Sequence, residues 1–413
     1  MLEINLKTDD EYQRFCHGRL SNPYPLLRKI REEDSVHWCE QMKSWLLTRH
    51  EDVYNAFLDQ RMSSQKVQTL MEQLPPELRT KVNALGKHLS MWVSHTDPPN
   101  HTRLRRLVSQ AFSPKTVVRM KPHIQQIADD LVNQVQSEGQ MDLIGQFAYP
   151  LPVIVICELL GIPPDDRRQF SGWVDDIVAT TDGSGPERPR TAEKSQQALF
   201  QLMDYLHDIV EDRRSNPRED LISSLVAFEA EEDRLSPDEL YAMINQLLVG
   251  GHDTTTALIG NAMLALFQFP AELEKLRNNP ALITMAVEEF LRYETPAPRN
   301  TRRALEDLVI GGQSIQAGQT VLLMVISANR DAAMFPDPDR LNIARHPNQH
   351  LSFGWGSHFC LGAPLARQIA QISINTLLRR LPRIHLADKG HAENPPWLNS
   401  MGLRTLELLP VDF

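Results

Sequence analysis

The sequence lacks the features that would place a protein in a membrane or on a nucleic acid. It has no run of 18 apolar residues, which a bilayer-spanning helix would need, and its first ten residues contain no apolar signal segment. Positive charge is in deficit, because 43 lysine and arginine residues stand against 53 aspartate and glutamate residues. The formal net charge of −10 argues against nucleic-acid binding and favours solubility. We therefore expect a cytoplasmic protein with no membrane anchor and no nucleic-acid partner.

Cysteine is also scarce. The four cysteines are Cys16, Cys39, Cys157 and Cys360, and no two of them have the C-x-x-C spacing of zinc ribbons or thioredoxin-like redox sites. The sequence therefore excludes these two kinds of site. So few cysteines without a framework pattern indicate a reducing compartment.

The chain is long enough to bury a sizeable core, since 41% of its 413 residues are hydrophobic. Length alone would suggest two or three domains, but no linker-like stretch or internal repeat divides the chain. Periodicity and capping residues predict helices at 26–33, 114–138, 151–160, 165–180, 191–214, 237–269 and 280–292. Alternation and turn residues predict strands at 37–39, 45–48, 308–310, 314–315, 321–326 and 403–409.

The longest predicted helix carries an unusual segment in its middle. Ser236 and Glu239 form a capping box at its start, and the helix should run uninterrupted to Phe269. Its centre is apolar nearly all round and should be buried, yet it holds the adjacent pair Gly250 and Gly251. Each glycine costs a helix about 1 kcal/mol relative to alanine. The pair indicates either close helix packing or a gap that admits a small ligand.

An acid and a hydroxyl follow these glycines directly. Asp253 and Thr254 would be costly to bury in an apolar segment without partners, so they indicate a functional site. His252 is a weaker candidate, because it could simply pair with a nearby carboxylate.

A second unusual stretch surrounds Cys360. Gly354 and Gly356 allow a tight turn before it, and an amphipathic helix that ends near Pro382 follows. Backbone N–H groups at the helix start would favour a thiolate, which is a good ligand for a soft or borderline metal. On its own, however, a lone cysteine beside an apolar helix is more often a small core residue.

The wider pattern decides between these readings. Phe353-x-x-Gly356-x-His358-x-Cys360-x-Gly362 resembles the haem-binding loop of the cytochrome P450 family. The resemblance implies that the Cys360 thiolate is the axial ligand of haem iron. It also implies a mainly α fold with a smaller β-rich part, a triangular prism that holds haem between the long central helix and the cysteine loop. We expect a single domain, with a β-rich lobe at about 1–60, 297–345 and 383–413 and a helical lobe at about 61–296 and 346–382.

The resemblance also implies roles for other residues. Asp253 and Thr254 match the family's oxygen-activation motif and would be catalytic. Glu289 and Arg292, which taken alone look like a solvated surface pair, match the E-x-x-R motif and would form a buried network with Arg340. The residues expected to bind the cofactor or its propionates are His101, Arg105, Gly251, Arg302, Phe353, His358 and Gly362.

The sequence leaves open the directions of the arginine side chains near residue 300. Strand alternation lets only one of Arg302 and Arg303 face the haem, and the family match favours Arg302. Arg299 either points away, pairing with a carboxylate such as Glu294 or Glu306, or anchors an acidic substrate group at the pocket rim.

Val249 and Gly250 are further expected substrate contacts. The glycine- and proline-containing joint 182–189 is expected to act as a lid hinge.

The predicted function is that of a haem-thiolate monooxygenase with haem b as cofactor. It would insert one atom of O2 into an apolar or amphipathic small molecule, in hydroxylation or epoxidation. Electrons from NAD(P)H would arrive through a ferredoxin and its reductase or through a flavodoxin, and we expect a monomer. The alternatives are a non-catalytic haem sensor or carrier and a peroxide-dependent peroxygenase, and the intact Asp253–Thr254 pair disfavours both.

Overall fold

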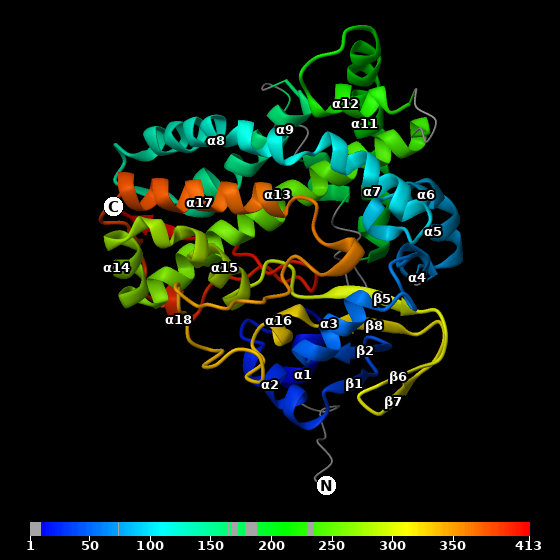
Figure 1. Ribbon diagram of the computed structural model, residues 1–413, viewed down its shortest axis with the longest axis horizontal. Helices are drawn as coiled ribbons and strands as arrows, with labels where there is room; N and C mark the ends of the chain where they lie inside the picture. Colours follow the sequence, from blue (N-terminus) through cyan, green and yellow to red (C-terminus); the bar gives the residue numbers. More distant parts are fainter. Residues whose placement is uncertain (1–9, 73, 164–165, 167–171, 178–187, 230–234) are drawn as a thin grey trace.

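The computed structural model describes residues 10–72, 74–163, 166, 172–177, 188–229 and 235–413. Long helices fill most of the molecule, and a sheet lies against one end of them (Figure 1). The helices are α1 (Asp10–Cys16), α2 (Tyr24–Glu33), α3 (His50–Leu58), α4 (Val67–Glu72), α5 (Pro76–Lys81), α6 (Asn83–Ser90), α7 (Asn100–Ala111), α8 (Pro114–Val135), α9 (Pro150–Leu160), α11 (Arg188–Ser215), α12 (Leu221–Ala227), α13 (Pro237–Gln268), α14 (Pro270–Asn278), α15 (Ile283–Tyr293), α16 (Val325–Ala328), α17 (Ala363–Arg380) and α18 (Gly390–Glu393). None of these described helices is both long and apolar enough to cross a bilayer.

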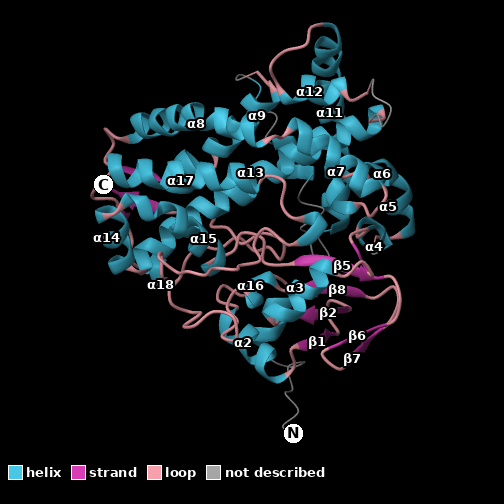
Figure 2. Ribbon diagram, viewed as in Figure 1, coloured by secondary structure: helices cyan, strands magenta, loops and turns pink. Residues whose placement is uncertain are grey.

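The strands are short and come from distant parts of the chain (Figure 2). They are β1 (Val36–Cys39), β2 (Ser44–Leu47), β3 (Met62–Ser63), β4 (Gln140–Asp142), β5 (Asn300–Ala304), β6 (Leu308–Ile310), β7 (Gln313–Ile315), β8 (Thr320–Leu323), β9 (His385–Leu386) and β10 (Pro410–Asp412). The largest sheet has the order β1-β2-β8-β5-β3, with β2 and β8 parallel and its other neighbours antiparallel. This sheet fixes β5 beside β8, with Arg302 opposite Val321.

Helix α13 is the central element of the helical part. Ser236 and Glu239 form the predicted capping box, and the helix continues for 32 residues without a break. At about 1.5 Å per residue this gives a rod of about 48 Å, which crosses the molecule (Figure 1). It packs against α9, α15 and α17, so nearly all of its second half is buried. The predicted long buried helix is thus confirmed.

Most other predicted elements are present, and two strand assignments are wrong in part. Most of the predicted helix 165–180 lies outside the described residues, within which 172–177 is helical. Strand β8 ends at Leu323, and 325–328 form the helical turn α16. Tertiary contacts override the strand propensity of Val325 and Ile326: the Ile326 amide donates to the Pro298 carbonyl, and the Ser327 hydroxyl donates to the Thr48 carbonyl.

The segment 403–409 was predicted as a strand, but it pairs with another strand only through one bridge, between Trp397 and Leu406. Its amides instead donate to scattered acceptors, including the Pro296 carbonyl and the Asp142 carboxylate. The strand lies just beyond it, as β10. Within the expected hinge, 182–187 lie outside the described residues, so its gating role stays a prediction.

Candidate active site

The Cys360 loop has the tight turn that its glycines predicted. Gly354 and Gly356 have φ values of +68° and +72°, in the region that glycine adopts without strain. A Cβ on Gly356 would lie 3.2 Å from the Phe57 carbonyl oxygen, so the α3 backbone also approaches here too closely for a side chain. The Cys360 amide donates to the Phe353 carbonyl at 2.9 Å, which closes the loop. These contacts hold the Cys360 sulfur at a fixed place just before α17.

The helix end does not by itself make Cys360 a thiolate. Burial raises the pKa of the thiol, and this effect outweighs the backbone N–H groups of Gly362 and Ala363 and the positive charges of Arg105 and Arg367. The backbone N–H groups favour the thiolate, as the sequence predicted, but burial of the sulfur just before α17 has the larger effect. A bound metal cation would supply the missing positive charge and deprotonate the thiol outright.

A cavity of about 410 Å³ lies between the Cys360 loop and the middle of α13. Its walls include most of the predicted site residues, among them Val249, Gly250, Gly251, Thr254, His101, Arg105, Arg302, Phe353, His358, Cys360 and Gly362. Further lining residues had no signal in the sequence, and these include Phe57, Lys66, Trp92, Phe112, Gln246 and Asn300. Apolar side chains make up most of the cavity wall, and Cys360 and Thr254 both belong to it.

The two glycines of α13 have different roles. A Cβ on Gly251 would lie 3.2 Å from the Ile156 side chain, so this glycine permits close packing against α9. A Cβ on Gly250 would meet nothing within 4 Å, and this glycine faces the cavity. Close helix packing is thus found at Gly251, whereas the gap that admits a small ligand stays a prediction, for which Gly250 is the better placed of the two.

The acid and the hydroxyl of α13 point in different directions. The Thr254 hydroxyl donates to the Gly250 carbonyl at 3.2 Å and stays at the cavity wall. Asp253 is not among the described residues that line the cavity. Its carboxylate lies 3.0 Å from the ring nitrogen of His252 instead.

Lys66 and four further side chains that can carry a positive charge line the cavity, and no aspartate or glutamate is among the described residues that line it. The four further side chains are His101, Arg105, Arg302 and His358. The imidazoles of His101 and His358 are 3.9 Å apart between centroids, and the Nε2 of His101 is buried with no hydrogen-bond partner in the described part of the chain. Burial, followed by the charges of His101, Arg302 and Arg105, lowers the pKa of His358 to about 3. Burial also lowers the pKa of Arg302 to about 10.

Arg105 and Arg302 donate to the neutral carbonyls of Phe359 and Thr301, and the charge of Asp97 acts on His101 and Arg302. The unpartnered Nε2 of His101 and the crowding of like charges would both be relieved by a further anion. A haem placed on the Cys360 side of the cavity carries two propionates, which would supply that anion. The sulfur, the apolar walls and the donor set thus fit haem. Arg302 rather than Arg303 lines the cavity, as the sequence predicted, and the Arg303 guanidinium lies near Gly318 in the turn before β8.

We expect Arg302→Leu to lose haem roughly ten- to hundredfold faster than the wild type, because one charge-assisted hydrogen bond contributes about 1.5–3 kcal/mol. Haem transfer to an apo-globin acceptor measures this rate. Arg303→Leu is the matched control and should retain haem like the wild type, since Arg303 does not line the cavity. Equal haem loss from both variants would contradict the role of Arg302.

The buried network around Glu289 contains a different third residue from the one predicted. Glu289 and Arg292 are fully buried and joined by two hydrogen bonds of 2.8 Å. Arg345, not Arg340, adds its Nε at 3.1 Å from both carboxylate oxygens. Arg340 is exposed and contributes its carbonyl, which accepts from Arg292 and Arg345. The assignment of Arg340 was wrong because a turn at 337–340 directs its side chain outward and its carbonyl inward.

Arg299 does not contact the Cys360 cavity. Its Nε donates to the Met401 carbonyl at 3.0 Å, and the residue is not among the described cavity-lining residues. Glu294, one of its two expected partners, pairs with Arg404 at 2.8 Å. The proposed substrate contact through Arg299 is therefore withdrawn, and Asn300 faces the cavity in that segment.

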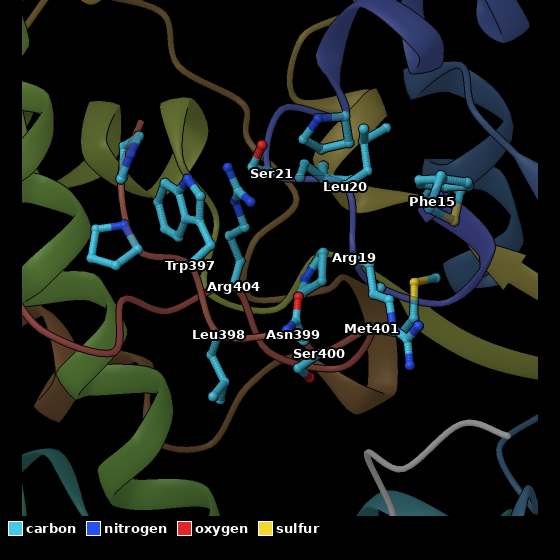
Figure 3. Close-up of a pocket in the computed structure, with 17 residues that line it drawn as sticks. Phe15, Arg19, Leu20, Ser21, Trp397, Leu398, Asn399, Ser400, Met401 and Arg404 are labelled. Atoms are coloured by element: carbon cyan, nitrogen blue, oxygen red, sulfur yellow. The ribbon is translucent and has the colours of Figure 1, made fainter. Parts of the chain in front are cut away.

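A second, smaller cavity of about 220 Å³ lies between the α1–α2 connection and the 395–404 loop. Figure 3 shows Trp397 beside Arg404, and the guanidinium lies 3.5 Å from the ring centroid. Arg404 also binds Glu294, which accepts a hydrogen bond from Tyr24. These contacts join the C-terminal loop to α2 and α15, and the cavity has no residue in common with the Cys360 cavity.

Comparisons with known proteins agree with this geometry. The cytochrome P450 family model matches residues 186–395. The polyketide biosynthesis cytochrome P450 PksS of Bacillus subtilis is 41% identical over 400 residues, covering 94% of this chain and 95% of that protein. The 6-deoxyerythronolide B hydroxylase of Saccharopolyspora erythraea is 37% identical over 392 residues, covering 94% of each protein.

Solved structures give the same result. P450BioI, in complex with an acyl carrier protein ligated to hexadec-9Z-enoic acid, has a TM-score of 0.88 and 36% identity, covering 97% of this chain and 100% of that one. Bacillus subtilis PksS has a TM-score of 0.85 and 40% identity, covering 95% and 97%. Both sequence and structure comparisons thus extend over nearly the whole chain. The chain therefore belongs to the cytochrome P450 family of haem-thiolate monooxygenases.

Proposed function

We propose that this protein transfers one atom of O2 to an apolar or amphipathic small molecule, with electrons that derive from NAD(P)H and arrive through a ferredoxin or flavodoxin. The observation that carries this proposal is the shared cavity, because Cys360 and Thr254 both line the same largely apolar space. Haem bound at Cys360 would supply electron transfer and oxygen activation. The side chains of the protein would bind the substrate, exclude bulk water and deliver protons.

The cavity walls would bind and orient the substrate and exclude bulk water. Val249 and Gly250 on one side and Ala297 and Asn300 on the other would contact it, the last through a polar amide. Thr254 would hold a proton donor near the reacting oxygen, because its hydroxyl both accepts and donates hydrogen bonds. Asp253 would resupply that proton after its carboxylate has taken one up from water, once the carboxylate is no longer held by His252.

The substrate class is left broad because the relatives differ. Among them are proteins named for polyketide biosynthesis, for biotin biosynthesis and for vitamin D3 25-hydroxylation, and a structure of CYP267B1 contains myristic acid. We propose a medium- to large-sized apolar or amphipathic substrate, in keeping with walls such as Trp92, Phe112 and Leu247. A spectral binding screen that begins with tetradecanoic acid and macrolide or steroid probes would identify ligands by the shift of the Soret band. If no apolar or amphipathic probe shifts the band, the proposed substrate class is wrong.

We expect Thr254→Ala to retain haem and ligand binding but to divert electrons from product to hydrogen peroxide. The product-forming step should fall roughly 10²-fold, the lower range for a positioned proton donor. The assay compares NAD(P)H consumed, peroxide released and product formed. Thr256→Ala is the control, because Thr256 is a buried threonine two residues further along α13 and is not among the described residues that line the cavity. Unchanged coupling in Thr254→Ala, or the same loss in both variants, would contradict the role of Thr254.

This experiment also separates the alternatives. A haem sensor or carrier would form no product with any redox partner. A peroxide-dependent enzyme would form product from hydrogen peroxide faster than from NAD(P)H and O2, and Thr254→Ala would leave that reaction unchanged. The position of Thr254 at the cavity wall favours the O2-dependent reaction.

A further inference from the structure

His252 lies on α13 beside the acid–hydroxyl pair and has an unusual environment. Its side chain is only 4% exposed, and the edge of the Tyr149 ring packs against it. Nδ1 lies 3.2 Å from the Leu248 carbonyl oxygen. Nε2 lies 3.0 Å from the Asp253 carboxylate and 3.3 Å from the Asp175 carboxylate. Both ring nitrogens therefore face oxygen acceptors.

This arrangement determines the protonation state of the ring. A neutral imidazole has one N–H and one bare nitrogen. Whichever of the two nitrogens is bare, its lone pair would face a lone pair of the oxygen acceptor beside it. Both nitrogens must therefore carry protons, which makes His252 an imidazolium. Burial lowers the pKa of the ring, but the hydrogen bonds and charges of Asp175 and Asp253 outweigh burial and raise that pKa to about 10. An imidazolium repels a metal cation. Asp175, His252 and Asp253 therefore form an ion-pair network and not a metal-binding site.

The two carboxylates compete for one N–H. Asp253 lies next to His252 on α13, whereas Asp175 belongs to the helical segment 172–177 and is 48% exposed. One N–H can be well aligned with only one acceptor at a time, so a stronger bond to one carboxylate weakens the bond to the other. Asp175 also accepts a hydrogen bond from the Tyr149 hydroxyl at 3.3 Å, which holds it near the ring.

We propose that His252 is a positioning residue whose single Nε2–H is shared between Asp175 and Asp253, so that the contact with Asp175 frees the Asp253 carboxylate to take up a proton from water and pass it toward Thr254. The proposal rests on the proposed function of the Asp253–Thr254 pair. It assigns a role to Asp175, which lies outside the cavity lining, and links the position of segment 172–177 to the acid of the active site. When the Asp175 contact is absent, His252 holds Asp253 more tightly and proton delivery slows.

The first test measures the ion-pair network without catalysis. Histidine labelled with ¹⁵N is observed by NMR in the ferrous carbon monoxide form of the holoenzyme, and the His252 signals are assigned by their loss in His252→Gln. In the wild type both ring nitrogens should be protonated at pH 7.5. Asp175→Asn should lower the pKa of His252 and leave it paired with Asp253 alone. A neutral His252 in the wild type, or a pKa that Asp175→Asn does not change, would overturn the proposal.

The second test measures where electrons go. With a ferredoxin, its reductase, NADPH and tetradecanoic acid as the probe, the fraction of electrons released as peroxide is defined whether or not the probe is hydroxylated. Asp175→Asn should raise the ratio of peroxide to the fully reduced products about two- to tenfold, the range that one shared hydrogen bond covers. Asp204→Asn, an exposed carboxylate on α11, is the control and should behave like the wild type.

A double-mutant cycle distinguishes positioning from a general structural effect. In the His252→Gln background, which has no imidazolium to share, Asp175→Asn should have no further effect on the peroxide ratio. An equal effect of Asp175→Asn in both backgrounds would overturn the proposal. If Thr254→Ala does not change coupling, the proposed function fails. A change in coupling with Thr254→Ala but not with Asp175→Asn means that only the role of His252 fails.

Discussion

Replacing Glu289 with glutamine is expected to destabilise the folded protein by about 3–5 kcal/mol, which is the usual cost of breaking a buried ion pair by removing one partner. The carboxylate is fully buried and accepts hydrogen bonds from Arg292, Arg345, Asn348 and the Asn342 amide. Glutamine keeps the size of the side chain but leaves both guanidinium charges without an anion. Urea unfolding followed by circular dichroism measures the loss, and the yield of haem-loaded protein should fall with it.

The same network provides a matched pair of arginine variants. Arg345→Ala should cost several kcal/mol, because its side chain is 9% exposed and binds Glu289. Arg340→Ala should change the unfolding free energy by only about 0.5 kcal/mol or less, since the exposed side chain can be removed while the carbonyl that accepts from Arg292 remains. Equal destabilisation by the two substitutions, or a larger effect at Arg340, would contradict the network that the structure places here.

Replacing Cys360 with serine is expected to abolish the red-shifted Soret band of the reduced carbon monoxide complex. That band requires a thiolate ligand, and a serine hydroxyl is a far weaker donor to iron at neutral pH. The substitution is nearly isosteric, and the loop is held by backbone bonds such as that from the Cys360 amide to the Phe353 carbonyl. The fold and the capacity to bind haem in the cavity should therefore persist.

Cys157→Ser is the control for this experiment. Cys157 is a buried thiol on α9 that is not among the described residues lining the cavity, so the variant should keep the red-shifted band even if its stability falls. Circular dichroism of both variants checks that they are folded. A Cys360→Ser protein that keeps the band would show that another residue binds the iron.

The elements that the sequence predicts well are those with a local physical cause. The capping box at Ser236 and Glu239 predicts the start of α13, and the apolar residues that follow predict its burial. Gly354 and Gly356 predict the turn before Cys360, because few other residues adopt positive φ there. His101, His358 and Arg302 lie far apart in the chain, and only the family pattern indicated that they would meet at one cavity.

The errors arise where side-chain direction depends on distant contacts. Arg340 and Arg345 lie in an irregular segment with no periodicity, so the sequence does not show which guanidinium points toward Glu289. Arg299 is directed by a carbonyl of Met401, about a hundred residues away. The orientation of Asp253 depends likewise on His252, whose charge depends on Asp175 from a different helix. None of these partners leaves a spacing pattern in the sequence.

The most direct test of the central claim is the origin of the oxygen atom in the product. A ligand found by the spectral screen is incubated with the holoenzyme, a ferredoxin, its reductase and NAD(P)H under ¹⁸O2, and the product is analysed by mass spectrometry. We predict one ¹⁸O atom in each product molecule and none when the reaction runs under ¹⁶O2 in H2¹⁸O. Product oxygen that derives from water, or product that forms at the same rate without O2, would contradict the account.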